Sequence, residues 1–343
     1  MIRISTWASL IGVFFSLGCQ SEHGKCVLQP ANEYKEYVID AESELSTLNL
    51  YTFEDHGHEY LTFPVHKKRA ILIYDLLSGK LVQNFFFNVE KPRGIGTELY
   101  GYYAKDMGHI YVPDFNEKAI YETDTTGVFK KTINFNVTDD GLIPMPAYYN
   151  NLHNVQLTFI GNKLYIPQQL NASLGSSWVE KSPIGITVDT VSGNVRKLPM
   201  NFPPLIPSKE LKNCIEGSLP YSEVFDGKRF IYSFSMDENL YVVSPDHHNI
   251  QKIKAKSKYI PELKFRKIPS DFSKTLKTTC EAATYGNIIY DKYRQVYYRF
   301  AYPESELDDN EDFLRILNSG KKEFSIIILD KNLKILGETK FPP

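Results

Sequence analysis

The sequence predicts an all-β protein, a β-propeller in which six blades are favoured and seven are the alternative. Three observations predict this fold. Short runs of β-branched and aromatic residues dominate from residue 34 onward, turns rich in Asp, Asn and Gly separate these runs, and helical patterns are rare. A propeller protects many short strand edges by radial repetition. A large β-sandwich is the alternative architecture, because it also consists of short alternating strands.

The first element is a secretory leader over residues 1–18. Arg3 supplies its positive start, and residues 4–15 supply an apolar stretch interrupted by small or hydroxyl residues. The sequence SLGC at 16–19 resembles the lipobox of bacterial lipoproteins, although its first two residues depart from the usual pattern. We therefore expect Cys19 to carry a lipid anchor. An ordinary secretory signal, or an uncut anchor, is the alternative.

Residues 19–33 are mostly polar and are expected to form a lipidated tether for the folded body. Gln20 follows the acylated cysteine where Asp would retain a lipoprotein at the inner membrane. The predicted location is therefore the bacterial outer membrane, on its periplasmic or its surface-facing side. Each buried methylene of an acyl chain contributes about 0.8 kcal/mol, so two or three chains would anchor the protein firmly.

Residues 34–343 are predicted to form the propeller domain from one recurring unit. An apolar strand ends at or near an Asp, a short polar turn follows, and a second strand leaves. Asp can accept a hydrogen bond from the backbone two residues on, and Gly tolerates the left-handed conformation of such turns. The five visible copies are marked by Asp75, Asp124, Asp189, Asp246 and Asp330.

A sixth blade is placed in the longest interval, between the fourth and fifth copies, around residues 259–268. We expect residues 34–39 to complete the last blade beside the C-terminal strand. Residues 304–319 have a helical pattern, and Gly320 can end the helix, so a short helical insertion is predicted in the last blade.

Cys26, Cys214 and Cys280 remain when Cys19 is set aside. Export would place them in an oxidising compartment, so a bridge between Cys214 and Cys280 and a pair of buried free thiols are equally open. None of the three has the spacing of a zinc site, and no metal is expected.

Three short motifs carry a family resemblance: DLLSGK at 75–80, KAKSKY at 254–259, and YDKYRQVYYR at 290–299. In these motifs the chain resembles the uncharacterised propeller lipoproteins of Bacteroidota, a family of unknown function. The resemblance covers most of the mature chain. It implies a propeller, and because the family has no assigned activity it implies no chemistry.

Two loops contain candidate ligand-binding residues. Tyr148, Tyr149 and His153 lie in a stretch rich in aromatic and amide side chains, which suit stacking on a carbohydrate and hydrogen bonding to it. Arg93 is a cation on a turn near an expected blade end. Either loop can equally be an ordinary solvated connection between blades.

Alternating lysines form the third candidate. Lys254, Lys256 and Lys258 continue a period-two pattern from Lys252, which places their ammonium groups on one face of an extended segment. Such a face can bind an anionic glycan, a phosphate or a lipid headgroup. The competing interpretation is an outer strand whose lysines prevent edge-to-edge pairing.

The net charge and the sequence motifs argue against several classes of function. Lys and Arg number 39 against 41 Asp and Glu, a net charge of −2 that argues against a nucleic-acid partner. The catalytic and cofactor-binding motifs with defined spacing do not occur, so no cofactor is expected. His56 and His58, and the adjacent His247 and His248, are interpreted as exposed turn residues.

We therefore expect a lipid-anchored envelope propeller that binds a partner protein or a glycan and is not an enzyme. The alternative is a propeller hydrolase or lyase that acts on an envelope or extracellular glycan. Its acid and base would come from different blades and would leave no linear motif.

Overall fold

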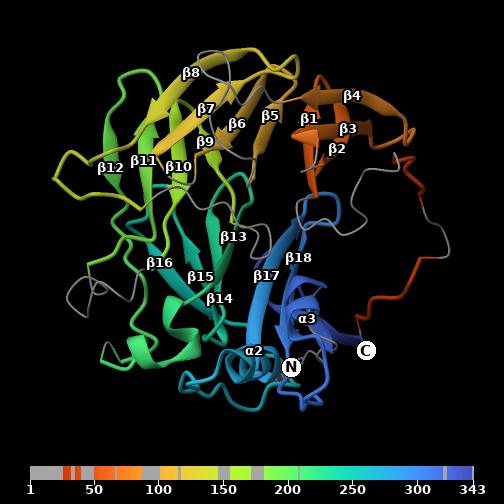
Figure 1. The fold of residues 1–343 in the computed structure, drawn as a ribbon, viewed down its shortest axis with the longest axis vertical. Helices are drawn as coiled ribbons and strands as arrows, with labels where there is room; N and C mark the ends of the chain where they lie inside the picture. The colour runs from red at the N-terminus through yellow and green to blue at the C-terminus, as the bar shows by residue number, and fades with distance from the viewer. Residues whose placement is uncertain are drawn as a thin grey trace, which may run out of the picture.

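Five four-stranded antiparallel sheets surround a common axis in the computed structural model (Figure 1). The fold class is therefore confirmed as a β-propeller, with each blade built from four consecutive strands. The structure describes residues 26–31, 35–39, 50–65, 68–86, 101–114, 117–145, 155–170, 181–207, 209–319 and 323–341.

The strands follow one another in chain order within every blade. They are β1 (Tyr51–Asp55), β2 (His58–Val65), β3 (Ala70–Asp75) and β4 (Leu81–Phe86); β5 (Tyr103–Asp106), β6 (His109–Pro113), β7 (Ala119–Thr123) and β8 (Phe129–Asn134); β9 (Thr158–Ile160), β10 (Lys163–Pro167), β11 (Gly185–Asp189) and β12 (Val195–Lys197); β13 (Tyr221–Phe225), β14 (Phe230–Phe234), β15 (Asn239–Val243) and β16 (Ile250–Lys254); and β17 (Thr284–Asp291), β18 (Val296–Tyr302), β19 (Phe324–Leu329) and β20 (Ile335–Phe341).

The predicted blade count is wrong: the described residues form five blades where six were favoured. The five marker Asp residues fall one to a blade, at the turn between its third and fourth strands. The long intervals between them are taken up by connections and not by further strands. Residues 259–268, where a sixth blade was placed, run as irregular chain with one isolated bridge from Lys267 to Cys214.

The marker turns form as the sequence predicts. The Oδ1 atom of Asp189 accepts hydrogen bonds from the backbone N–H groups of Val191 (3.0 Å) and Ser192 (2.8 Å). Gly193 follows with a φ of 76°, a conformation that a side chain disfavours. The Oδ1 atom of Asp75 accepts from the backbone of Ser78 in the same way, at 2.6 Å. The hairpin repeat is therefore encoded locally.

Neighbouring blades pack face to face through apolar clusters. Phe85 from the first blade and Ile110 from the second belong to one such cluster, and Tyr165 from the third and Phe230 from the fourth belong to another. Further clusters join the second blade to the third and the fourth to the fifth. Burial of apolar area contributes about 25 cal/mol for each Å², so these interfaces stabilise the ring.

The last blade meets the first through charged side chains in the described part of the chain. The Nζ atom of Lys292, in the β17–β18 turn, lies 2.9 Å from Glu54 and 2.8 Å from Glu59. The Tyr293 hydroxyl also bonds Glu59. The face of the first blade that points away from the second blade has its own apolar cluster, and Tyr37 of the N-terminal segment packs against it.

The N-terminal segment contacts both the first and the last blade. The backbone N–H of Leu28 donates to the Thr339 hydroxyl of β20 at 2.7 Å, and the backbone of Cys26 lies against Gly337. Residues 35–39 form no strand, and the prediction that they complete the last blade is wrong for this described part. The last blade already has four strands of its own, so it needs no strand from the N-terminus.

Two helices occupy the connections around the fifth blade, and two short 3-10 turns, Leu211–Asn213 and Ile215–Ser218, precede the fourth. Helix α2 (Phe272–Glu281) was not predicted; its N-terminus is capped by Asp271, whose side chain accepts from the backbone of Lys274. Helix α3 (Phe313–Ser319) lies between β18 and β19 and confirms the predicted insertion.

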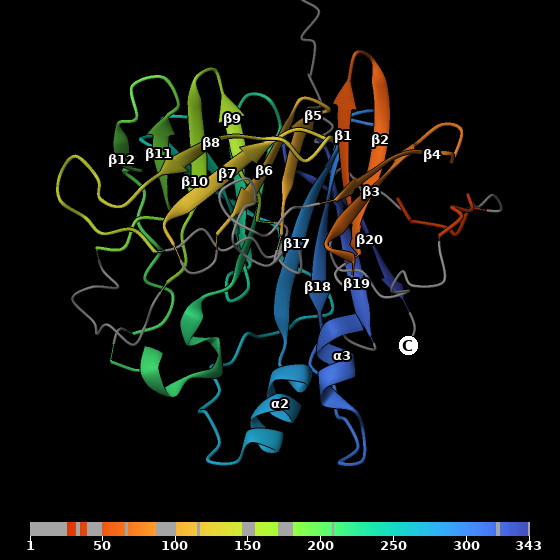
Figure 2. The ribbon, with the colours of Figure 1, turned by 45° about the horizontal axis from the view of Figure 1, so that its top comes forward.

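The two helices lie together at one end of the ring (Figure 2). No helix in the ranges that the structure describes has both the length and the apolar character needed to cross a bilayer.

Candidate functional site

The first strand of each blade lies innermost, facing the axis of the ring (Figure 1). Because the blades repeat, equivalent positions on β1, β5, β9, β13 and β17 converge on one central space. A cavity of about 460 Å³ opens between these five strands. Its volume falls in the range of small-molecule pockets.

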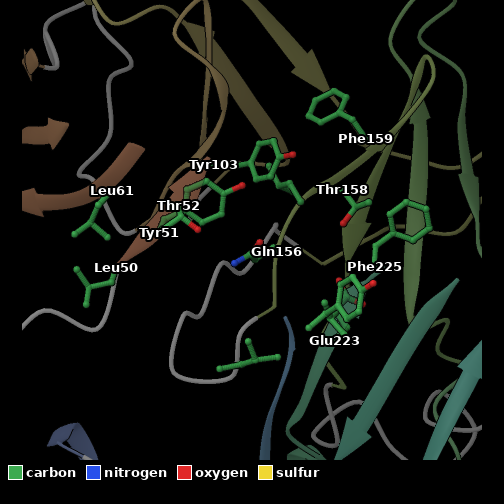
Figure 3. A pocket seen from close by; sticks show the side chains of 14 residues that line it. Leu50, Tyr51, Thr52, Leu61, Tyr103, Gln156, Thr158, Phe159, Glu223 and Phe225 are labelled. Atoms are coloured by element: carbon green, nitrogen blue, oxygen red, sulfur yellow. The ribbon is translucent and has the colours of Figure 1, made fainter. Parts of the chain in front are cut away.

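Every blade contributes one aromatic side chain to this central cavity (Figure 3). The Tyr51 and Tyr103 rings have centroids 5.6 Å apart, and those of Tyr103 and Phe159 lie 5.8 Å apart. Aromatic pairs at such separations hold one another in place. The five residues are Tyr51, Tyr103, Phe159, Phe225 and Tyr290.

Polar side chains lie between the aromatic rings. Thr52, Gln156 and Thr158 bring hydroxyl and amide groups to the wall, and Glu223 brings a carboxyl group. The wall therefore combines apolar and aromatic residues with several polar groups, a combination that can bind an organic ligand. Glu223 carries the one carboxyl group among the lining residues that the structure describes.

Glu223 lies in an unusual environment for a carboxyl group. It stands on β13 opposite Tyr232 of β14, and only 7% of its surface is exposed. Burial raises its pKa from 4.5 to about 8, while a hydrogen bond with the Tyr232 side chain acts in the opposite direction. The carboxyl group is therefore protonated at neutral pH.

Tyr232 connects Glu223 to a histidine deeper in the fourth blade. The Tyr232 hydroxyl lies 2.6 Å from Nε2 of His247, and Nδ1 of His247 lies 3.2 Å from the backbone oxygen of Pro245. His247 is 1% exposed, so burial lowers its pKa to about 4. The interpretation of His247 as an exposed turn residue is wrong, because its backbone φ of 59° turns the ring inward onto Phe230.

Several predicted site residues lie outside the residues that the structure describes, and they stay predictions. The set comprises Cys19, Arg93, Tyr148, Tyr149 and His153.

The predicted lysine face is divided in the structure. Lys254 lies on β16, the outermost strand of its blade, and its Nζ is 3.0 Å from Glu238; the Nζ of Lys256 is 3.2 Å from the other oxygen of the same carboxylate. This arrangement agrees with lysines that guard an outer strand. Lys256 and Lys258 also line a second cavity of about 650 Å³, together with Cys26.

The two buried cysteines, Cys214 and Cys280, lie in different apolar clusters. Cys214 belongs to the apolar cluster of the third and fourth blades, and Cys280 packs with Leu307 and Phe313 around the two helices. Neither belongs to a disulfide in the structure. Of the two alternatives for this pair, the structure therefore lacks the bridge.

Acidic, histidine and cysteine side chains do not gather in groups of three or more suited to a metal ion, as far as the described ranges extend.

Comparison with known proteins gives the chain a family. Residues 30–340 match a domain of unknown function, DUF4221. The chain belongs to this family. The match confirms the resemblance to an uncharacterised Bacteroidota family; lipidation stays a prediction.

A solved member of the DUF4221 family from Bacteroides vulgatus is similar to this chain. It is 26% identical with a TM-score of 0.77, over 89% of this chain and 84% of that one. A putative exported protein from Bacteroides fragilis is 12% identical with a TM-score of 0.50, over 89% of this chain and 74% of that one, which shows the fold alone. No protein of curated function matches the sequence.

Sequence reasoning missed the central site of this DUF4221 domain. Its candidates were chosen by local composition, whereas the cavity takes one to three residues from each of five distant strands. A usable signal exists: an aromatic residue recurs in the first strand of every blade.

Proposed function

We propose that the central cavity binds an uncharged, hydroxyl-rich ligand, a neutral glycan. The observation that carries the proposal is the aromatic side chain contributed by every blade. Flat rings can stack on the C–H faces of sugars, while the threonine, glutamine and carboxyl groups between them can exchange hydrogen bonds with sugar hydroxyls. A protonated Glu223 leaves the described lining without a formal charge, which suits an uncharged ligand.

A panel of glycans tests the proposal. The purified body of the chain, residues 26–343, is applied to an array of neutral and acidic oligosaccharides, and each positive is titrated by calorimetry. Replacing Phe159 by Ala should weaken binding about tenfold, since an aromatic contact is worth about 0.5–1.5 kcal/mol. Phe272→Ala is the matched control, because that ring lies on α2 and is 70% exposed. If no glycan on the array binds, the proposal is overturned, and a partner protein becomes the favoured ligand.

A second candidate function is cleavage of a glycan, either by hydrolysis or by the elimination reaction of a lyase. One observation favours it. A buried carboxyl group with a pKa near 8 is suited to act as a general acid. Glycoside hydrolases generally pair such an acid with a second carboxyl group. Incubation of each bound oligosaccharide with the protein, followed by chromatography, separates the two functions. Products that disappear with Glu223→Gln would establish turnover, and an unchanged oligosaccharide would support binding alone.

We also propose that Cys19 anchors the protein to the bacterial outer membrane. The support is the lipobox-like sequence before it and the polar stretch that separates it from the folded body. Expression of Cys19→Ala beside the natural chain, followed by membrane fractionation and mass spectrometry of the N-terminal peptide, tests this. Release of the variant into the soluble fraction is expected, and an unmodified natural N-terminus would refute lipidation.

A further inference from the structure

One interface between neighbouring blades is built differently from the others. Apolar clusters join the first blade to the second, the second to the third, the third to the fourth and the fourth to the fifth. Between the fifth blade and the first, which we call the seam, the described residues provide the ion pairs of Lys292 with Glu54 and Glu59 and the Tyr293 contact with Glu59. Lys292 and Glu54 are about half exposed, and exposed ion pairs contribute little to stability and are screened by salt.

The N-terminal segment covers the side of the first blade that faces the seam. Side chains alternate along a strand, and Ile73 of β3 faces the second blade, so its neighbours Leu72 and Tyr74 face the seam. Tyr37 and Ile39 pack against this side. The rings of Tyr37 and Tyr74 meet edge to face, with their centroids 5.4 Å apart. The segment therefore covers side chains that a preceding blade covers in the rest of the ring.

The same segment reaches the seam side of the last blade. Ile327 of β19 belongs to the cluster shared with the fourth blade, so its neighbour Ile326 faces the seam. Thr339 of β20 is the cross-strand partner of Ile326 and therefore lies on the same side of the sheet. The Thr339 hydroxyl accepts a hydrogen bond from the backbone N–H of Leu28 at 2.7 Å. The N-terminal segment thus contacts both walls of the seam.

The described parts of this segment, residues 26–31 and 35–39, lie on the outer side of the ring between the last blade and the first, where they are drawn in red (Figure 1). Polar contacts add to the apolar packing on the first blade. The Tyr74 hydroxyl donates to the backbone oxygen of Val38 at 2.7 Å, and the Nζ atom of Lys35 donates to backbone oxygens of the β3–β4 turn. These contacts fix the path of the segment across the seam.

The two blades that meet at the seam also form part of the central cavity. Leu50 and Tyr51 line it from the first blade, and Ile289 and Tyr290 line it from the last. Leu50 is 57% exposed and Ile289 is 42% exposed, so both apolar side chains keep surface that a ligand can cover. A change in the spacing of the two blades would move one part of the lining relative to the other. The seam therefore controls how well the cavity fits a ligand.

We propose that the N-terminal segment is a strap that holds the last blade against the first and regulates binding in the central cavity. When the strap is released, the exposed ion pairs remain at the seam, the two blades separate more readily, and the affinity for a ligand that touches both blades falls. The coupling is reciprocal, so such a ligand stabilises the docked strap. The strap continues into the stretch that carries the predicted anchor at Cys19, so a pull on the anchor would reach the cavity. This inference rests on the proposed function for its ligand, but docking of the strap can be measured without one.

Hydrogen exchange of the unliganded chain tests the docking. In the double variant Tyr37→Ala with Ile39→Asp, peptides from β2–β3 and from β19–β20 should exchange about fivefold faster, while those from the second and third blades keep their natural rates. Val38→Ala is the matched control, because Val38 lies between the two and is 85% exposed. Gly337→Val acts on the other wall of the seam, should give the same pattern, and serves if the double variant does not fold. Natural rates in the seam strands of the variant, or equal acceleration in all five blades, would overturn the inference.

Ligand binding measures the coupling between the strap and the cavity. Neutral hexasaccharides of glucose, mannose and galactose are the probes, and one that binds the natural chain is titrated into each variant. Its affinity should fall about fivefold or more in the double variant and stay unchanged in Val38→Ala. The same sugar should slow hydrogen exchange of residues 26–31 and 35–39 in the natural chain. An unchanged affinity in the double variant would overturn the inference. Failure of all three sugars on the natural chain would overturn the proposed function, and the exchange pattern then decides whether the strap closes the seam.

Discussion

Replacing Arg299 by Ala should lower the free energy of unfolding by about 3–5 kcal/mol. Arg299 lies on β18 of the last blade with none of its surface exposed. Its guanidinium group reaches into the fourth blade, where it donates to the backbone oxygens of Asp237 (2.6 Å), Glu238 (2.9 Å) and Ala255 (3.0 Å). It therefore ties two blades together through groups that water does not reach.

The magnitude follows from what the variant would leave behind. A buried acceptor that loses its partner costs about 1–3 kcal/mol. Here the three backbone oxygens just named, that of Asn239 at 3.5 Å and the Ser233 hydroxyl each lose a donor. The cation also lies 3.8 Å from the centre of the Tyr285 ring, a contact that Ala cannot make. Part of this cost is offset because the variant no longer has to bury a charge; in the natural chain the burial of that charge lowers the pKa of Arg299 to about 10.

Urea denaturation followed by intrinsic fluorescence measures the effect. Arg294→Ala is the control, because Arg294 lies in the adjoining hairpin turn, is 74% exposed and pairs only with Asp291 at 2.9 Å among its ion pairs in the described chain. It should cost far less than Arg299→Ala, because an exposed ion pair contributes little to stability. Arg299→Lys keeps the charge with fewer donors and should fall between the two, and it serves if the alanine variant does not fold. Equal costs for Arg299→Ala and Arg294→Ala would refute the reasoning.

Four further predictions follow from burial and packing. The free energy of unfolding should fall as the pH rises from 6.5 to 8, because Glu223 keeps its proton up to about pH 8 when folded but loses it near 4.5 when unfolded, and denaturation of Glu223→Gln should lack this slope. Equal stability of the natural chain at pH 6.5 and pH 8 would contradict this assignment. Between pH 6.5 and about 4.5 the two groups act in opposite directions, because the pKa of His247 falls from 6.5 to about 4 on folding while that of Glu223 rises from 4.5 to about 8. Acid destabilisation through His247 should therefore appear over this range in Glu223→Gln and be largely cancelled in the natural chain. Gly337→Val should displace the N-terminal segment, whose backbone would collide with the new side chain, and limited proteolysis should remove that segment faster than in the natural chain. Alkylation in guanidinium without reductant should label both Cys214 and Cys280, and protection of both would indicate a bridge.

The hairpins could be predicted because their determinants are local. Asp189 and Gly193 specify a turn within five residues, and the alternation of apolar side chains specifies the strands on each side. The family motif at 290–299 forms the hairpin between β17 and β18. Its last residue, Arg299, acts across the blade interface, a role that no local pattern contains.

The blade count and the site could not be predicted because both depend on distant segments. An interval of chain between two marker turns has the same length whether it holds a blade or a helix, and α2 fills the interval that was assigned to a sixth blade. Likewise, the residues next to Phe159 and Phe225 in the sequence are those of any strand, and the two rings line a common cavity only in the folded ring of blades. The burial of His247 depends on a left-handed backbone conformation that the residues next to it in the sequence do not predict.

Every blade is a self-contained run of the chain, and the last one borrows no strand from the N-terminus. Duplication or deletion of the gene segment for one blade would therefore add or remove a complete four-stranded sheet, and no strand elsewhere would lose its partner. The circumference of the ring would change, and so would the width of the space between the innermost strands, while each remaining blade kept its own turns. Evolution can in this way change the size of the central cavity by whole blades and adjust its lining by single substitutions on the first strand of each blade.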